Sequence, residues 1–444
     1  MMTRMLRVAE PLYIKAKKTK LSDENLPYFR FSLRPIKSVA DAFLGQCPMM
    51  NVNKKDSSAI REAVDCILAN AHQENNLRVK NFSRTSKDTE GFAKTSFLRT
   101  LDHFESRGLL SREGKGVTRS IITFAPEIRE HEPTGVVEWP ESAVIYNKKG
   151  EGDKFSNALK RCETEIGRRL EAIWQFYLEH RIETGLTKEE FEIFNAAQLV
   201  QGKQKLIVPD PAKILPYFVF NDEDLTMGGR MYGAFWIGMK QMLRRSIKID
   251  GELTTDIDGK GMHVQLLYRQ ANREMPPGDP YVYSDPKERK VAKKAMLLMM
   301  NTKCEMSPER GRDAVIATFK KSFKQDFETK LGGDKKRLLE VIQSLEHHHM
   351  GIRDSFYRPN WGALQRTEGM IMLKIMEEGM RDGIVILPVH DGCLCQRQHK
   401  DRVMQYFAEM KIEAAVNPKH ERELGIEETR RLVEAYQDYV AANE

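Results

Sequence analysis

The spacing of apolar residues predicts two helices and a hairpin in the N-terminal third of the chain. A first helix, with Ser57 or Ser58 as its N-cap, carries apolar residues three and four positions apart. A second helix lies within the range 95–124 and ends at Gly108, and two short strand-like runs joined by a basic, glycine-bounded turn follow it. The apolar positions of the two helices are Ile60, Val64, Ile67, Leu68, Phe97, Leu98, Leu101 and Phe104.

This order of elements resembles winged helix-turn-helix domains, in which the second helix of the motif enters a groove of the nucleic acid and the wing touches the backbone. The resemblance implies that residues 51–130 form a DNA-binding module with contacts from Lys94, Arg99, Lys115 and Arg119. Many winged helices bind proteins instead, and that alternative stays open.

Changes in composition divide the rest of the chain. Apolar residues at helical spacing predict a long helix from Leu159 to Ile182 and a shorter helical stretch from Thr187 to Leu199. The predicted organisation is an irregular basic arm (1–50), the winged-helix module (51–130), a linker rich in turn-forming and charged residues (131–155), a helical thumb-like or connecting region (156–220) and a domain that carries the chemistry (221–444).

Composition narrows the class of protein. The 444 residues are enough for two or three cores, and Lys and Arg outnumber Asp and Glu by 71 to 64, a mild excess that suits a polyanionic partner. The six cysteines lack zinc-binding spacing and predict reduced thiols of an intracellular protein. No apolar stretch approaches the roughly 18 residues of a membrane span. We expect a soluble, cytoplasmic protein without a structural zinc.

Two aspartates each follow an apolar, strand-like run in the C-terminal half. The first run ends at Asp258, where glycines turn the chain into a helix, so that a carboxylate suited to a metal lies at an exposed corner. The second run leads into His390-Asp391-Gly392 and predicts a hairpin with a carboxylate at its tip, although Asp-Gly alone is a strong hairpin signal and a purely structural role is the alternative. Asp256 would share a strand face with Asp258 and is a rival ligand. We prefer Asp258 for its spacing.

A cationic helix is predicted between the two aspartates. Arg289 and Lys293 are four residues apart and therefore share one face of it. A guanidinium can fork the oxygens of a triphosphate, and an ammonium can neutralise or protonate departing pyrophosphate. An ordinary solvated run of charges is the alternative.

The three motifs together, in this order, resemble those of family A DNA polymerases. The segment 258–263 is similar to their first catalytic motif, 289–301 to their Arg-x3-Lys-x7-Tyr-Gly fingers helix, and His390-Asp391 to their Val-His-Asp motif. Upstream, 226–230 (Thr-Met-Gly-Gly-Arg) is similar to their Thr-x-x-Gly-Arg element, and 364–368 to their Gln-containing helix. The resemblance covers roughly 215–440. It extends to phage-type single-subunit RNA polymerases and is closest to short uncharacterised polymerase-like proteins of mobile elements.

The resemblance implies an α+β fold, with a right-hand palm built on an antiparallel sheet, a helical thumb-like region and helical fingers at about 285–350. It implies DNA synthesis on a primed template from nucleoside triphosphates, with two Mg²⁺ ions, for which Mn²⁺ could substitute. The ions would be held by Asp258, Asp391 and the backbone carbonyl of Ile257 or Gly259. The other implied roles are Lys293 at pyrophosphate, Arg289 at the triphosphate, His390 at the primer terminus, and Arg230, Tyr232 and Gln365 at the primer–template.

Two positions bear on the choice of sugar. His263 takes the place of the glutamate that family A DNA polymerases hold against the ribose 2′-hydroxyl, whereas the RNA polymerases keep a small residue there, so His263 favours deoxynucleotides. Asn301-Thr302 replaces the Tyr-Gly pair that ends the fingers helix in both relatives, and Asn301 could contact the sugar differently.

The hypothesis from the sequence is a small, exonuclease-free DNA polymerase of a plasmid, phage or integrative element. A single-subunit RNA polymerase or primase is one alternative, and a non-catalytic DNA-binding replication initiator or regulator with a decayed palm is another. The run His347-His348-His349 is not expected to bind a metal, since adjacent side chains on a helix point in different directions.

Overall fold

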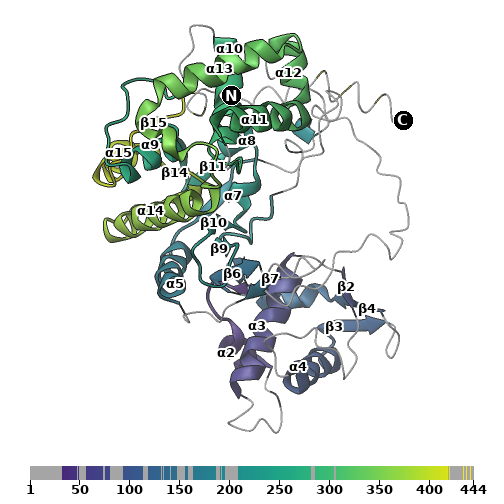
Figure 1. Ribbon diagram of the computed structural model, residues 1–444. Helices are drawn as coiled ribbons and strands as arrows, with labels where there is room; N and C mark the ends of the chain where they lie inside the picture. The colour runs from purple at the N-terminus through teal and green to yellow at the C-terminus, as the bar shows by residue number, and fades with distance from the viewer. Residues whose placement is uncertain are drawn as a thin grey trace. The chain divides into compact units, whose positions relative to one another are not determined.

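The chain forms two compact units in the computed structural model (Figure 1). The first comprises 1–141, 187–215 and 424–444, and the second comprises 142–186 and 216–423. The structure describes residues 33–47, 49, 57–73, 76–80, 94–113, 119–131, 133, 135–140, 142–147, 156–158, 164–186, 191, 193–195, 209–281, 286–304, 307–418, 420, 434, 437 and 441. The boundary at 141/142 falls inside the range predicted as a linker, and 187–215 groups with the first unit rather than with the helix that precedes it.

The first unit is built on helices and a three-stranded antiparallel sheet in the order β2-β4-β3. Its elements are β1 (Leu33–Pro35), α2 (Ala40–Gln46), α3 (Ser57–Gln73), β2 (Asn76–Lys80), α4 (Lys94–Ser106), β3 (Leu110–Glu113), β4 (Arg119–Phe124), the short helix η2 (Pro126–His131) and β5 (Val136–Glu138). β1 pairs with β5 as a second, two-stranded sheet. The two predicted helices and the hairpin of β3 and β4 are confirmed, and β5 lies within the range predicted as a linker.

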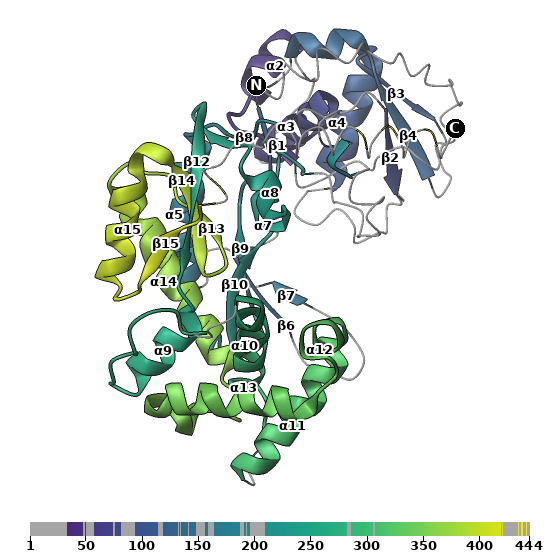
Figure 2. The ribbon, with the colours of Figure 1, turned by 90° about the horizontal axis from the view of Figure 1, so that it is seen from above.

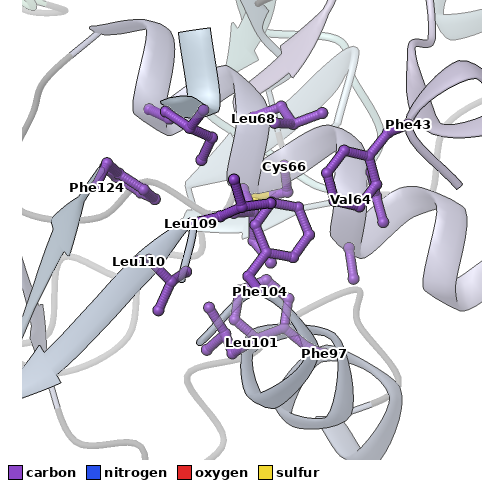
Figure 3. Packing of buried hydrophobic residues seen from close by; sticks show 14 of the residues in the cluster. Phe43, Val64, Cys66, Leu68, Phe97, Leu101, Phe104, Leu109, Leu110 and Phe124 are labelled. Carbon is purple, nitrogen blue, oxygen red and sulfur yellow. The ribbon is translucent and has the colours of Figure 1, made fainter. Parts of the chain in front are cut away.

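A hydrophobic core holds α2, α3, α4, the β3–β4 hairpin and η2 together (Figure 3). The apolar face of α3 packs against that of α4, and Phe43 of α2 stacks on Phe104 with ring centroids 4.5 Å apart. Of the predicted apolar positions, Leu98 is only half-buried, and the others are in the core. α4 stops two residues before Gly108, whose φ of +73° favours glycine and ends the helix as the sequence predicts.

The second unit contains two sheets. A six-stranded antiparallel sheet runs β13-β14-β12-β11-β8, with β15 also paired to β12, and a four-stranded sheet runs β10-β9-β6-β7, in which only β6 and β9 are parallel. The strands are β6 (Val144–Asn147), β7 (Ser156–Ala158), β8 (Ile182–Thr184), β9 (Tyr217–Phe220), β10 (Gly228–Tyr232), β11 (Ile247–Ile249), β12 (Glu252–Gly259), β13 (Leu387–Val389), β14 (Gly392–Gln396) and β15 (Ala414–Val416). The predicted α+β class with antiparallel sheets is confirmed.

Helices cover these sheets. α14 lies against β10, and α15 lies against β12 and β14, while α10, α11, α12 and α13 gather in one group (Figure 2). The helices are α5 (Glu165–Leu178), α7 (Phe235–Gly238), α8 (Gln241–Arg244), α9 (Met262–Gln270), α10 (Pro286–Met299), α11 (Pro308–Ser322), α12 (Lys324–Leu331), α13 (Lys335–His348), α14 (Trp361–Arg381) and α15 (Lys400–Glu409), with short helices η3 (Met350–Ser355) and η4 (Arg397–His399).

The helix predicted from Leu159 to Ile182 is shorter than expected. α5 begins after Thr164, whose hydroxyl accepts a hydrogen bond from the Gly167 amide at 2.9 Å, and it ends at Leu178. Asp250 ends it, because one of its carboxylate oxygens accepts from the Arg181 amide at 2.8 Å and the other lies 2.7 Å from His180 Nδ1. Ile182 consequently starts β8. Of the stretch 187–199, residues 191 and 193–195 are helical, and the others lie outside the described residues.

The backbone of α14 approaches that of β10 closely at Gly369. A Cβ atom added to Gly369 would lie 1.9 Å from the carbonyl oxygen of Gly229. We expect Gly369→Ala to destabilise the protein by about 3 kcal/mol or more, because backbone has to move to make room. Thermal unfolding measures the effect. Gly238→Ala is the control, since a Cβ there meets nothing within 4 Å, and an equal loss in both variants would contradict the prediction.

Candidate active site

Two aspartates distant in the sequence meet on neighbouring strands. In the pairing of β12 with β14, Asp258 stands opposite Gly392, the residue after Asp391. The amide of Gly259 donates a hydrogen bond to the carbonyl oxygen of Asp391 at 3.0 Å. The two predicted metal ligands therefore lie side by side at one end of the β12–β14 pair.

The hairpin that carries Asp391 differs by one residue from the predicted one. Val389 pairs with Gly392, so His390 and Asp391 form the two-residue turn and Gly392 already belongs to β14. His390 takes the positive φ of +56° that such a turn requires. Gly392 is required for steric reasons and not for its backbone conformation. An added Cβ would lie 2.4 Å from Asp258 Oδ1 and 2.5 Å from the carbonyl oxygen of Ile257, so only glycine lets both oxygens approach the turn.

The two carboxyl groups are electrostatically strained. Burial, together with the charges of Asp256 and Asp391, raises the pKa of Asp258 to about 6. Burial and the charge of Glu368 raise the pKa of Asp391. The cations Arg244 and Lys293 act in the opposite direction on Asp258. Two half-buried acids whose charges repel each other suit a divalent cation, since Mg²⁺ takes oxygen ligands from one or two carboxylates and from its substrate.

Asp256, the rival ligand, has other partners. Its side chain is fully buried, and Oδ2 accepts a hydrogen bond from Asn417 Nδ2 at 3.2 Å and lies 3.9 Å from His420 Nδ1. Asp258 is therefore the better candidate. In the part of the chain that the structure describes, no group of three or more His, Cys, Asp or Glu side chains is arranged to hold a metal. The candidate ligand set is the aspartate pair with the carbonyl of Ile257.

Glu368 on α14 was not among the predicted site residues, yet it connects two of them. Its carboxylate, 1% exposed, accepts two hydrogen bonds from Arg230, Nε at 2.8 Å and Nη2 at 3.2 Å. Nε2 of His263 lies 2.8 Å from Glu368 Oε2. Burial alone would raise the pKa of Glu368, but His263 and Arg230 hold it below its usual value. No local signal distinguishes Glu368, because the polar run Gln365-Arg366-Thr367 precedes it in the sequence.

His390 lies next to the same cluster. Its ring centroid is 6.2 Å from that of Tyr232 in an edge-to-face arrangement. Burial, followed by the charge of Arg230, lowers the pKa of His390, so the imidazole is neutral near pH 7. A neutral ring beside the carboxylate pair can accept or donate one hydrogen bond without adding charge.

The cationic face of α10 contacts Asp279 and Tyr281, which were not among the predicted site residues. Arg289 donates a hydrogen bond from Nε to Asp279, and its guanidinium lies 5.5 Å from the ring centroid of Tyr281. Lys293 Nζ lies 5.7 Å from the same centroid. Lys293 also lowers the pKa of both Asp258 and Asp391, which indicates that its charge faces them.

Three residues predicted to contact a duplex line one hollow. Arg230, Tyr232 and Gln365 surround a space of about 480 Å³ together with residues of β9, the turn after it and the first turn of α14. The side chain of Tyr232 is 41% exposed there. The remaining lining residues are Tyr217, Val219, Asn221 and Trp361. The hollow thus combines a cation, amides and aromatic rings.

Other predicted positions lie apart from this cluster. Asn301 follows the end of α10, and its Nδ2 donates to the carbonyl oxygen of Leu297 at 2.7 Å. His349 is buried and structural, with Nε2 2.8 Å from the Pro280 carbonyl oxygen and Nδ1 3.2 Å from the Tyr268 hydroxyl.

The positions predicted to bind DNA in the first unit are only partly described. Arg99 is half-buried on α4. Lys94 and Arg119 are described by their backbone alone, in α4 and β4, and Lys115 lies outside the described residues.

No model of a known protein family matches the sequence, and a search of curated proteins finds no similar one. No helix in the described ranges is both long and apolar enough to cross a membrane. The geometry of this site and the motifs in the sequence are therefore what point to a function.

Proposed function

We propose that the protein is a template-directed nucleotidyltransferase, and specifically a small DNA polymerase in which Asp258 and Asp391 hold Mg²⁺. The observation that carries the proposal is the meeting of these two half-buried carboxylates on neighbouring strands, with Lys293 of a cationic helix facing them. Phosphoryl transfer needs such an arrangement, because its catalysis consists mostly of positioning and of stabilising negative charge.

The donor set fits Mg²⁺. Asp258, Asp391 and the carbonyl oxygen of Ile257 are hard oxygen ligands around Gly392, which leaves room beside them. When bound, two such ions would lower the pKa of a primer 3′-hydroxyl and draw charge off the leaving pyrophosphate. The protein's own contribution is then electrostatic. Lys293 neutralises or protonates the pyrophosphate, and Arg289 grips the triphosphate with its guanidinium.

The surroundings of the carboxylate pair suit a primer terminus and a deoxyribose. His263, whose Nε2 lies 2.8 Å from Glu368 Oε2, puts an imidazole at the position that is proposed to exclude a ribose 2′-hydroxyl. The hollow lined by Arg230, Tyr232 and Gln365 offers hydrogen bonds and aromatic contacts to a nucleic acid, with neutral His390 between the hollow and Asp391. These contacts support deoxynucleotides as substrates and DNA as the primer.

The first unit supports a nucleic-acid partner. The order α3, β2, α4 and the β3–β4 hairpin, with a three-stranded antiparallel sheet, resembles that of winged helix-turn-helix domains and supports this proposal. We propose that this module locates the template or an origin, with α4 and the hairpin toward the nucleic acid. DNA is the proposed partner of both units.

Incubation of the purified chain with primed and unprimed DNA templates, Mg²⁺ or Mn²⁺, and either dNTPs or NTPs tests the proposal. We expect extension of the primed template with dNTPs, analysed on a denaturing gel. Extension with NTPs alone would identify an RNA polymerase, and products on the unprimed template would identify a primase. No product under any condition, from a protein that still binds DNA, would favour a non-catalytic initiator or regulator.

A further inference from the structure

A loop before α10 brings a carboxylate to the cation that is proposed to bind the triphosphate. Within this loop, Oδ1 of Asp279 accepts a hydrogen bond from the Tyr281 amide at 2.8 Å, and Oδ2 accepts from Arg289 Nε. The ring of Tyr281 lies below both Arg289 and Lys293. Asp279 therefore occupies a position on Arg289 where a phosphate oxygen would bind.

The loop is fixed from two sides. His349 Nε2 lies 2.8 Å from the carbonyl oxygen of Pro280. On the other side, Pro280 and Tyr281 press on Gly261, where an added Cβ would lie 2.6 Å from Pro280 Cγ and 3.2 Å from the Tyr281 hydroxyl. Gly261 also has a φ of +62°, which a side chain would strain. Asp279 and Tyr281 are thus presented to α10 by a loop that is buried at Pro280 and Tyr281.

The loop borders an open hollow of about 380 Å³ with two ion pairs at its rim. Arg289 pairs with Asp279, and Lys260 pairs with Glu413. Both pairs are well exposed, with Arg289 and Asp279 at 47% and 39%. Lys293 makes no ion pair among the described residues. A polyanion entering the hollow would meet the exposed guanidinium of Arg289, and it could bind Nε of that guanidinium only by replacing Asp279.

We propose that Asp279 is a positioning residue that acts as the resident counter-ion of Arg289, and that a triphosphate binds by displacing it. The inference rests on the proposed function, because it takes Arg289 as a triphosphate ligand. In the absence of nucleotide, Asp279 holds the guanidinium over Tyr281. The exchange of one anion for another keeps the cation paired and makes the affinity for triphosphate depend on the strength of the Asp279 contact.

Binding of inorganic tripolyphosphate to the full chain, measured by titration calorimetry without divalent ions, tests this inference. Exposed ion pairs are weak, so Asp279→Asn is expected to tighten binding by only about two- to fivefold. Asp279→Glu should bind as the wild type does. Asp401→Asn, which removes an equal charge from the exposed first turn of α15, should also leave binding unchanged. Unchanged or weaker binding in Asp279→Asn, or an equal gain in Asp401→Asn, would overturn the proposal.

Two further measurements separate this inference from the proposed polymerase function. If the protein extends primers, Asp279→Asn should lower KM for the nucleotide without raising kcat. If it extends none, but Asp279→Asn still tightens tripolyphosphate binding, the polymerase proposal fails and the counter-ion role stands. Normal extension with a KM that Asp279→Asn does not lower would refute the counter-ion role alone. Tyr281→Phe keeps the aromatic ring and should preserve binding, whereas Tyr281→Leu should weaken it by about two- to fivefold.

Discussion

Asp258→Asn and Asp391→Asn are each expected to lower the rate of nucleotide addition by about 10²–10³-fold or more. A metal-bound carboxylate contributes several kcal/mol of charge stabilisation to phosphoryl transfer, and each 1.4 kcal/mol changes the rate tenfold. Asparagine keeps the shape of the side chain but not the charge. Single-turnover extension of a labelled primer measures the effect. Activity within threefold of the wild type in either variant would refute the metal site.

Asp258→Asn should not destabilise the fold. Because the folded pKa of Asp258 is raised to about 6, the folded state binds the proton more tightly than the unfolded chain does. The metal-free protein therefore loses stability as pH rises from about 4 through 6. Asp258→Asn removes this loss, so its melting temperature should equal or exceed that of the wild type at pH 7.5 and show no such gain at pH 4. A lower melting temperature at pH 7.5 would mean that Asp258 is structural.

Local patterns in the sequence were sufficient for the elements that carry the carboxylates. Strand β12 and helix α9 lie on either side of the predicted corner after Asp258, and α10 presents Arg289 and Lys293 from one helix as predicted. These features depend on hydrophobic periodicity and on glycine positions within about ten residues, and both can be recognised in a single sequence. The sequence predicted a turn at Asp391-Gly392, but the turn lies one residue earlier, at His390-Asp391. His390 takes the left-handed conformation that was expected for the Asp-Gly pair.

Partners from distant segments could not be predicted. Glu368 meets Arg230 from a helix 138 positions away, and Asp279 reaches Arg289 from an irregular loop. Nothing in the local pattern of either acid distinguishes it from a solvated one. The end of α5 could not be predicted for the same reason. The amide of Arg181 donates a hydrogen bond to Asp250, which lies 69 positions away in the sequence. Tertiary packing decides which side chains pair with backbone or charged groups from distant segments, and the local spacing of residues does not reveal that packing.

Glu368→Ala is expected to cause the largest loss of stability among the site residues. The carboxylate is 1% exposed, and its removal leaves the half-buried guanidinium of Arg230 without its partner. Breaking one side of a buried pair costs about 3–5 kcal/mol. Glu377→Ala is a matched control on the same helix, because Glu377 also makes two hydrogen bonds to an arginine, Arg169. That pair is more exposed, at 20% and 30%, and should cost about 1 kcal/mol or less.

The pH dependence of a second variant separates charge from packing. The folded pKa of Glu368 lies below its ordinary value of 4.5, so the ionised carboxylate stabilises the fold above that pH, and this contribution is lost as pH falls further. Glu368→Gln keeps the shape and loses the charge. Its deficit in unfolding free energy against the wild type should therefore be largest at pH 6–8 and shrink below about pH 4.5. A deficit that is the same at every pH would mean that Glu368 acts through packing, and that the charge of Arg230 needs no carboxylate beside it.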